Sequence, residues 1–365
     1  MFKHRKLLGL AAGVAFAHMA WSAPAVAAPF YEGKTVTILV GYGAGGASDL
    51  TARNIVQHLG QYVPGNPELI VQNMTGGGGI KAFNFLYERA KPDGLTLQFG
   101  AFSPISQVVG APGLRVKFDE LTVAGATVTP GGLVMYARSD AVQGGMKRAT
   151  DLVTAKDLKL AGIGPGAIPD VVGRLTLMAL DTPFRYIPGY RGSIKVVSAV
   201  RTGEASMGIA PLSTYRQVIE PNMVTTGDAK GLMQWSILDS EGKDTVNKYI
   251  PELPVFEEVY REIHGKDPSG LAYDALKFNM FILGNASHLL WGPPGMPKEA
   301  VDDMRQGMKK AMADPALIEQ QIKLSGYPQN WADPEVAEEV VKTVTTVSPD
   351  LKQFMVDFYN AGKAK

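Results

Sequence analysis

The 365-residue sequence contains no cysteine, and its charges almost cancel, with 36 Lys and Arg against 35 Asp and Glu. Without cysteine there is no disulfide framework, thiolate metal site or cysteine nucleophile. The formal charge of +1 provides no global basic field, so we expect no nucleic-acid partner. Disorder and coiled coil fit poorly, because 45% of the residues are apolar and only 19% are charged. The composition therefore favours a large globular protein.

Histidine is also scarce. His4 and His18 lie in the first 28 residues, and His58, His264 and His288 lie far apart, with no metal-ligand spacing. No nucleophile, base and acid combine into a specific catalytic set. We therefore expect a binding protein rather than an enzyme, with no catalytic residue, no metal and no cofactor.

Only one long apolar run is present, at residues 7–20, and it is too short for a membrane span of about 20 residues. Basic residues precede it and the small residues 25–27 follow it, which is the order of a secretory signal peptide. We predict that residues 1–28 are a signal peptide cleaved near Ala27 or Ala28, and that the mature protein is periplasmic. The alternative is a buried N-terminal helix.

Removal of this segment changes the charge. It carries Lys3, Arg5 and Lys6 and no acidic residue, so residues 29–365 have a formal charge of −2. A protein of that charge cannot attract anions by its overall field, and any anion binding must depend on local donors.

Strand-like segments run repeatedly into glycine-rich loops and then into helical patterns. We predict strands at 35–40, 69–72, 95–100, 159–162, 184–187 and 206–210. This βα winding is typical of parallel sheets, and a length above about 250–300 residues favours two lobes. Loops at the carboxyl ends of such strands bind ligands, and the N-termini of the following helices favour anions. The C-terminal third predicts helices at 298–313, 315–325 and 334–361.

The glycines permit other interpretations. Gly41, Gly43 and Gly46 match a dinucleotide-binding pattern, but the second strand ends in Gln72 and Asn73 where that pattern needs an acidic residue. A tight turn that binds nothing stays open, and anion binding is favoured.

The second loop, residues 76–79, lacks the Gly-Lys-Ser/Thr ending of a P-loop, so we reject phosphate binding of that kind. The four glycines favour a loop whose backbone approaches a ligand closely. The alternative is a flexible loop without a binding role.

Two side chains are candidates for ligand contact. Ser103, beside Phe102 after the third strand, suits a carboxylate with a carbon skeleton, or a local Ser-Pro turn. Arg191, between Tyr190 and Gly192, is a possible donor to an anion, or a solvated loop arginine.

In series, these motifs resemble the Bug family, the solute-binding receptors of tripartite tricarboxylate transporters. The similarity spans nearly the whole mature chain and is carried by TVTILVGYGAGGASDLTARNIVQHL, VQNMTGGGGIKAFNFLYERAKPDGLTLQFG, FRYIPGYRGS, IPELPVFEEV and WGPPGMPKEAVDDMRQGMKKAMADP.

The resemblance implies the α/β periplasmic-binding-protein fold: two α/β lobes joined by hinge strands, with a ligand cleft between them. We place lobe 1 at 29–131 and 238–365 and lobe 2 at 132–237. It also implies a receptor, which we expect to be a monomer, that captures a small organic carboxylate and delivers it to large and small integral membrane subunits. The alternatives are a ligand-presenting co-receptor for a membrane sensor and an exported enzyme on the same fold.

By motif position, the resemblance assigns ligand contacts to both lobes. They are Gly45, Gly46, Ala47, Ser48, Thr75, Gly76, Gly77 and Ser103 in the first lobe, and Gly164, Ala167, Ile168, Arg191, Gly192, Ser193 and Pro211 in the second. We add Tyr42 and Phe102 as first-lobe contacts, because we expect their rings near the cleft. The chain departs from the family at Ile168 and Pro169, where a Ser-x-His is common. With aromatic rings at Tyr42, Phe102 and Tyr190, this weakly favours an aromatic or apolar-bodied carboxylate.

Overall fold

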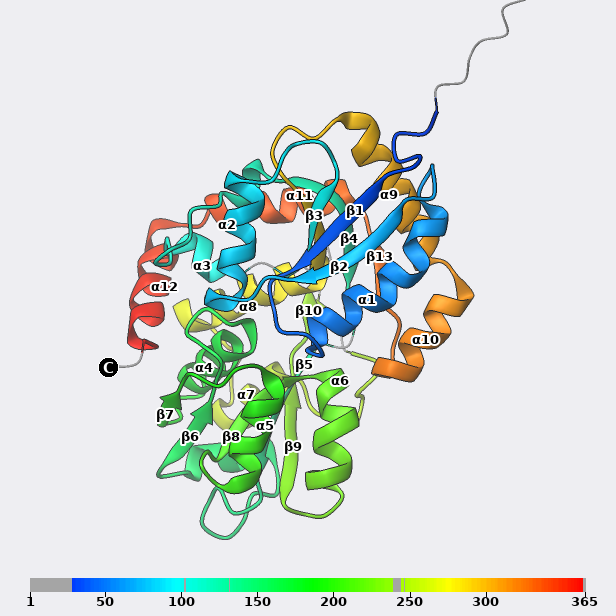
Figure 1. Ribbon diagram of the computed structural model, residues 1–365. Coiled ribbons are helices and arrows are strands. Elements are labelled where there is room, and N and C mark those ends of the chain that lie inside the picture. Colours follow the sequence, from blue (N-terminus) through cyan, green and yellow to red (C-terminus); the bar gives the residue numbers. More distant parts are fainter. Residues whose placement is uncertain (1–27, 102, 131, 239–243, 246, 364–365) are drawn as a thin grey trace, which may run out of the picture.

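The computed structural model describes residues 28–101, 103–130, 132–238, 244–245 and 247–363. The predicted signal peptide lies outside the described residues except for Ala28, and so does the predicted contact Phe102. The described chain forms two α/β lobes, each built on its own β-sheet (Figure 1). The predicted fold class is therefore confirmed.

The first sheet has six strands in the order β13-β4-β12-β3-β1-β2. Its central strand β1 pairs in parallel with β2 and β3, while β12 is antiparallel to β3 and β4, and β13 is antiparallel to β4. The strands are β1 (Thr35–Val40), β2 (Glu68–Asn73), β3 (Thr96–Gly100), β4 (Thr122–Val128), β12 (His288–Gly292) and β13 (Asn330–Ala332).

The second sheet has five strands in the order β7-β6-β8-β5-β9. Here β6 is parallel to β7 and β8, and β5 is antiparallel to β8 and β9. The strands are β5 (Leu133–Arg138), β6 (Leu158–Ala161), β7 (Phe184–Ile187), β8 (Met207–Pro211) and β9 (Ala229–Gln234). A short antiparallel pair, β10 (Ile237–Leu238) and β11 (Asp244–Thr245), lies outside both sheets.

The predicted βα winding accounts for three of the six strands of the first sheet and three of the five strands of the second. The six predicted strands form β1, β2, β3, β6, β7 and β8. Both sheets also contain antiparallel strands, among them β4 and β5 on either side of the first crossing between the lobes.

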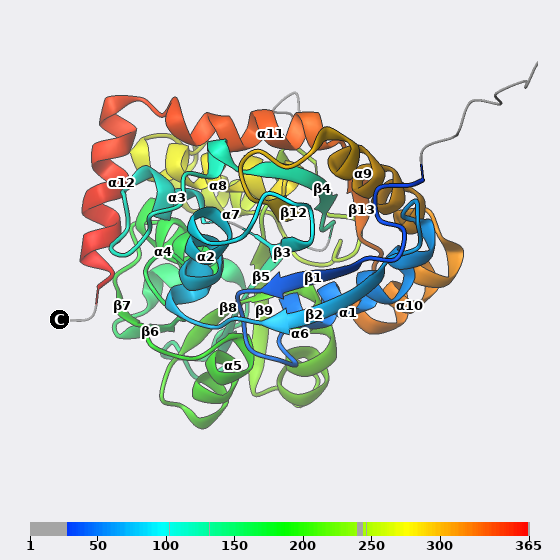
Figure 2. The same cartoon turned by 45° about the horizontal axis from the view of Figure 1, so that its top comes forward.

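The helices cover the sheets and fill the space between them (Figures 1 and 2). They are α1 (Ala47–Leu59), α2 (Ile80–Glu88), α3 (Pro104–Val108), α4 (Ile168–Ala179), α5 (Ser193–Thr202), α6 (Leu212–Thr214), α7 (Phe256–His264), α8 (Leu271–Asn285), α9 (Lys298–Met312), α10 (Pro315–Ser325), α11 (Pro334–Lys342) and α12 (Pro349–Ala361). A π-helix, η5 (Tyr215–Val224), follows α6, and short 3-10 turns include η2 (Gly77–Gly79) and η4 (Ala149–Thr154).

The predicted single helix at 334–361 is wrong, because the segment forms α11 and α12. Ser348 caps the second helix by accepting the Leu351 N–H, and Pro349 follows in its first turn. A proline disfavours helical backbone at the residue before it, so the break falls there.

One apolar core passes from the first sheet into the second. It includes Leu289 and Trp291 of β12, Leu276 and Met280 of α8, and Ile209 of β8. Two smaller clusters lie at the outer faces, one under α1 and α9 and one under α5 and η5. The helix α8 is thus the apolar bridge between the lobes.

The chain passes between the lobes first between the end of β4 at Val128 and the start of β5 at Leu133. The backbone N–H of Thr129 donates to the Ser287 hydroxyl at 2.7 Å, which anchors this crossing to the residue before β12. Two segments that follow β9 still contact the second lobe. Val255 forms a parallel β-bridge with Gln234 of β9, and Glu262 of α7 forms an ion pair with Arg148. The lobe boundaries at 131/132 and 237/238 stay a prediction.

Candidate functional site

The first two glycine-rich loops pack directly on each other at the carboxyl ends of β1 and β2. A Cβ placed on Gly41 would lie 2.8 Å from the Cα of Gly79, so only glycine fits there. The Tyr42 ring lies over Gly79, 3.8 Å from the position of a Cβ on that residue, and is 37% exposed. The dinucleotide-like glycine Gly41 therefore has a packing role between the loops.

Asp49, in the first turn of α1, holds the first loop in place. Its Oδ2 accepts the Gly45 N–H at 2.8 Å and Arg53 Nε at 3.0 Å, and its Oδ1 accepts Asn73 Nδ2 at 2.8 Å. Asn73 also donates to the Tyr42 carbonyl oxygen at 2.9 Å. Burial raises the pKa of the Asp49 carboxyl, but the hydrogen bonds it accepts outweigh burial and keep that pKa below its usual range.

The N-terminus of α1 presents donors that the fold does not use. The N–H groups of a helix's first turn have no intrahelical acceptor, and here Gly46 supplies no side-chain cap. Among the predicted contacts, Ala47 and Ser48 lie in this turn. By contrast, the Gly45 N–H donates to Asp49 and the Gly46 N–H donates to the Gly43 carbonyl oxygen at 3.2 Å.

The second loop depends on glycine throughout. All four of its residues, 76–79, have positive φ angles, from 58° at Gly77 to 147° at Gly76, which side chains rarely tolerate. The aliphatic part of Lys81 packs against Gly76, 3.2 Å from the position of a Cβ. The predicted contacts Thr75, Gly76 and Gly77 thus precede α2 as the sequence predicts.

Ser103 connects the two lobes. It caps α3, and its hydroxyl donates to the carbonyl oxygen of Gly166 in the second lobe at 2.6 Å. The Ser106 hydroxyl donates in turn to the Ser103 hydroxyl at 2.9 Å. A Cβ on Gly166 would collide with the Ser106 hydroxyl, so the loops of the two lobes meet closely here.

In the second lobe, Asp170 of α4 repeats the role of Asp49. Its Oδ2 accepts the Gly164 N–H at 2.7 Å and the Tyr186 hydroxyl at 2.6 Å. Burial raises the pKa of Asp170 to about 7, although these hydrogen bonds oppose the rise. The Ala167 N–H donates to the Gly164 carbonyl oxygen at 2.9 Å.

The helix α4 begins at Ile168, and Pro169 lies in its first turn, where a missing N–H costs no intrahelical hydrogen bond. Arg174, one turn further, is buried and donates to the carbonyl oxygen of Phe358 in α12. Ile168 has an apolar side chain, so at this position the start of α4 offers a backbone donor only.

The remaining second-lobe contacts surround α5. Arg191 is exposed, the Gly192 N–H donates to the Tyr190 carbonyl oxygen at 3.0 Å, and Ser193 begins α5. Pro211 ends β8.

The glycine-rich loops of both lobes lie at the facing ends of their sheets (Figure 1). The structure brings the first-lobe contacts together through Asp49, Asn73 and Tyr42, and it joins them to the second lobe through Ser103. The assignment of these residues to a ligand stays a prediction. The interpretation of the sequence missed Asp49, Asp170 and Tyr186, although an Asp followed by an Arg four residues later, after a glycine-rich loop, occurs in both lobes and marks them.

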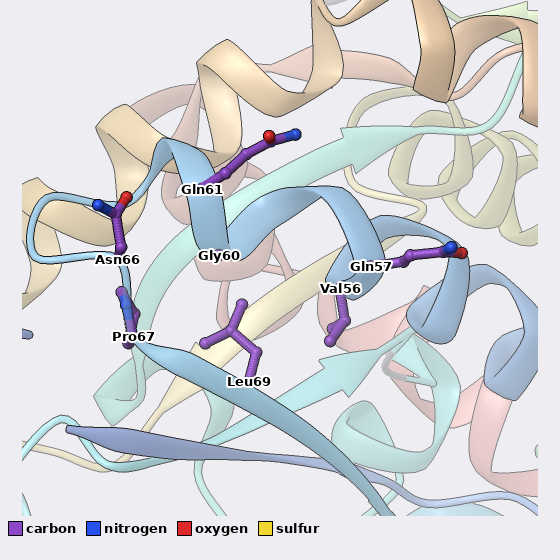
Figure 3. A pocket seen from close by; sticks show the side chains of 7 residues that line it. All are labelled: Val56, Gln57, Gly60, Gln61, Asn66, Pro67 and Leu69. Atoms are coloured by element: carbon purple, nitrogen blue, oxygen red, sulfur yellow. The ribbon is translucent and has the colours of Figure 1, made fainter. Parts of the chain in front are cut away.

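A surface hollow lies elsewhere, between α1 and β2. Val56 and Leu69 point toward each other across it (Figure 3). Its lining residues are Val56, Gln57, Gly60, Gln61, Asn66, Pro67 and Leu69. It lies at the opposite end of α1 from the glycine-rich loops, and nothing in its lining indicates anion binding.

No helix among the described residues has both the length and the apolar character to cross a membrane. In the same part of the chain, no three His, Asp or Glu side chains gather in a way that would hold a metal ion.

Comparison with known proteins agrees with the motifs. No protein-family profile matches the chain. A UPF0065 protein of Agrobacterium vitis, from the TAR-I ttuE-ttuC' intergenic region, is 25% identical over 320 residues, 86% of this chain and 82% of that protein. A UPF0065 protein of Pseudomonas sp. strain P51 is 24% identical over 342 residues, 92% of this chain and 90% of that protein. UPF0065 is the Bug family.

Solved structures share the fold. The periplasmic binding protein BugD has a TM-score of 0.63 at 21% identity, covering 90% of this chain and 98% of its own. MatC from Rhodopseudomonas palustris, with bound malate, has a TM-score of 0.63 at 19% identity, covering 89% and 99%. R. palustris Rpa4515 with adipate has a TM-score of 0.64 at 14% identity, covering 90% and 98%. The chain thus has the periplasmic-binding-protein fold, and the resemblance to the Bug family of solute-binding proteins that its sequence motifs predict is confirmed.

Proposed function

We propose that this protein is a periplasmic receptor that binds an organic carboxylate between its two lobes and delivers it to a membrane transporter of the tripartite tricarboxylate type. The observation that carries the proposal is the start of α1. Its first-turn N–H groups at Ala47 and Ser48 lack side-chain caps, and the neighbouring loop is fixed by Asp49. A helix N-terminus with free N–H groups on a fixed loop favours a carboxylate.

The second lobe supplies the opposite side of the site. The starts of α4 and α5 follow glycine-rich loops, and Arg191 is an exposed cation beside Ser193. In this proposal Ser103 and Gly166 mark where the lobes meet when closed. Solved proteins of the same fold carry malate and adipate, which supports a small carboxylate as the ligand class.

The ligand's body is a separate part of the proposal. The exposed Tyr42 ring at the first loop, together with Ile168 at the start of α4, favours a carboxylate with an apolar or aromatic body. Delivery to large and small membrane subunits follows from the family resemblance and from the predicted signal peptide.

The test is thermal unfolding of the mature chain with a panel of mono-, di- and tricarboxylates, including malate, adipate and aromatic acids. A ligand at a hundredfold excess over its Kd stabilises the folded state by about 2.7 kcal/mol, which raises the Tm by several degrees. Esters or amides of the same acids, which lack the charge, should give no shift. A panel that leaves the Tm unchanged would rule out the carboxylate.

Delivery needs its own test. Ligand-loaded receptor should be retained by co-expressed large and small transporter subunits in detergent or nanodiscs. Retention by a sensor ectodomain instead, with none by the transporter subunits, would contradict the transport role and leave ligand binding intact.

A further inference from the structure

The two lobes share one construction beneath their glycine-rich loops. Both lobes bury the aspartate, but only the second lobe also buries the arginine. In each lobe an Asp in the first turn of a helix accepts a loop N–H, and an Arg follows four residues later. In the first lobe Arg53 donates to Asp49 and its side chain is 47% exposed. In the second lobe Asp170 and Arg174 are each only 3% exposed.

Asp170 ties the loop to a neighbouring strand. A single oxygen, Oδ2, accepts both the Gly164 N–H at 2.7 Å and the Tyr186 hydroxyl at 2.6 Å. Gly164 follows β6 and Tyr186 lies in β7, which pairs with β6 in parallel. The carboxylate also leaves no room for a side chain on Gly162. The position of the loop therefore depends on the position of one carboxylate.

Arg174 extends this contact to the C-terminal helix. Its guanidinium lies over the Tyr186 ring at 4.9 Å and over the Phe358 ring at 3.9 Å, and it donates to the Phe358 carbonyl oxygen. No carboxylate forms a salt bridge with it among the described residues, and it occupies the space beside Gly362. Two aromatic rings and a helix-end carbonyl thus hold a buried cation.

Tyr359, the residue after Phe358 in α12, lies beside the second-lobe glycine-rich loop. The Tyr359 ring is 3.3 Å from the position of a Cβ on Gly166, and the Gly166 carbonyl oxygen accepts the hydroxyl of Ser103. Both views show α12, in red, beside α3 and α4 (Figures 1 and 2). The second-lobe loop is therefore held beneath by Asp170 and at its side by α12.

We propose that Asp170, Tyr186 and Arg174 are positioning residues that fix the second-lobe loop 163–167 and couple it to the C-terminal helix α12. The ligand that this loop meets is that of the proposed function, on which this part of the inference rests. The coupling between loop and helix is a property of the protein without ligand.

The pKa of Asp170 provides a second way to observe how this residue holds the loop. The titratable and charged groups that face Asp170 are Tyr186 from β7 and Arg174 from α4, while α12 adds only Tyr359 at the loop. Burial raises the pKa of Asp170 to about 7, so its charge changes near neutral pH. The amide proton that donates to it reports that change.

The first experiment is hydrogen exchange of the mature chain without ligand, for Arg174→Gln, Phe358→Leu and Asp170→Asn. We expect faster exchange both in the loop 163–167 and at the end of α12 in each variant. Asp302→Asn, which removes an exposed carboxylate paired with Lys298 on α9, is the matched control and should change neither. If the exchange rates changed only in the element that carries the substitution, or did not change at all, the coupling between loop and helix would be overturned.

The second experiment follows the Gly164 amide proton by NMR between pH 5.5 and 8.5. Its chemical shift should titrate with a midpoint near 7 in the wild type and stay flat in Asp170→Asn. Tyr186→Phe, which keeps the ring against Arg174 but removes the hydroxyl, should move the midpoint. A Gly164 amide with the same chemical shift and the same exchange rate in the wild type and in Asp170→Asn would show that Asp170 does not hold the loop.

The third experiment measures the Kd of the tightest ligand in the carboxylate panel. Arg174→Gln and Phe358→Leu, remote from the loop's N–H groups, should weaken binding roughly 2- to 30-fold. If the wild type binds and the variants bind equally, this inference fails and the proposed function stands. If the wild type binds no acid, the proposed function fails, and hydrogen exchange alone decides the coupling.

Discussion

The Ser103 hydroxyl of the first lobe donates a 2.6 Å hydrogen bond to the Gly166 carbonyl oxygen of the second. Ser103 is a predicted ligand contact, yet here its proton already has an acceptor across the lobes. In the proposed receptor, this bond stabilises the arrangement in which both sets of loops face the same ligand.

Ser103→Ala should therefore lower both stability and affinity. One lost hydrogen bond corresponds to about 1 kcal/mol in the free energy of unfolding and about a fivefold rise in Kd. Urea unfolding and calorimetric titration measure the two effects. Ser139→Ala removes a bond of the same type, to the Gly227 carbonyl oxygen within the second lobe, and should leave affinity unchanged. Tighter binding by Ser103→Ala would mean that the bond competes with the ligand.

Substitution of Gly46 should block the first loop. A Cβ at this position lies 3.1 Å from the Gly43 carbonyl oxygen, so even alanine crowds the loop. We expect Gly46→Ala to weaken binding moderately and Gly46→Val to weaken it more than about tenfold, because a branched side chain shields the α1 N-terminus. Titration of both variants, with circular dichroism as the check on folding, tests this. Wild-type affinity in a folded Gly46→Val would place the ligand elsewhere.

Asp49 should stabilise the fold at neutral pH and lose that effect in acid. Because its pKa is lower in the folded state, its contribution is present above the unfolded pKa of about 3.9 and is lost as the pH falls below it. We expect Asp49→Ala to cost about 1–3 kcal/mol at pH 7, with a smaller difference at pH 3. Asp302→Ala, at an exposed pair, should cost less than about 1 kcal/mol. Equal costs for Asp49→Ala at both pH values would contradict the role of its charge.

Asp170 should have the opposite dependence on pH. Its folded pKa is about 7 against an ordinary 3.8, so between these values the folded state holds a proton that the unfolded state has lost. The free energy of unfolding of the wild type should then fall relative to Asp170→Asn as the pH rises through this window. The slope is at most about 1.4 kcal/mol per pH unit. Chemical unfolding at pH 4, 5.5, 7 and 8.5 measures this slope. If the free energies of unfolding of the two proteins changed with pH in parallel, the pKa of Asp170 would not be raised in the folded state.

The sequence predicted the strands that carry the loops, because a buried β-branched run followed by glycines is a local signal. The predicted strand at 35–40 is β1, and the predicted strand at 184–187 is β7. The strands β4, β5 and β12 were missed, because their pairing depends on where the chain crosses between lobes. Such long-range pairing has no local signature.

The sequence predicted which loops form the candidate site. It did not predict the hydrogen bonds that hold those loops in place. Glycine motifs indicate where backbone approaches a ligand, but Gly45 and Gly164 each donate to an aspartate four or six residues further on. Whether an N–H is free depends on the side chain that folds back onto it. The contact of Tyr359 with Gly166 was equally beyond prediction, since the two residues are 193 positions apart.

The apolar core that runs through α8 makes the two lobes one unit for unfolding. A lobe that lost its structure alone would expose Leu276 and Met280, which pack in the core shared by both sheets. Heating should therefore melt both lobes in a single transition, and a ligand held by either lobe should shift the entire transition. An opening of the molecule that kept this core buried would leave the lobes in contact along α8.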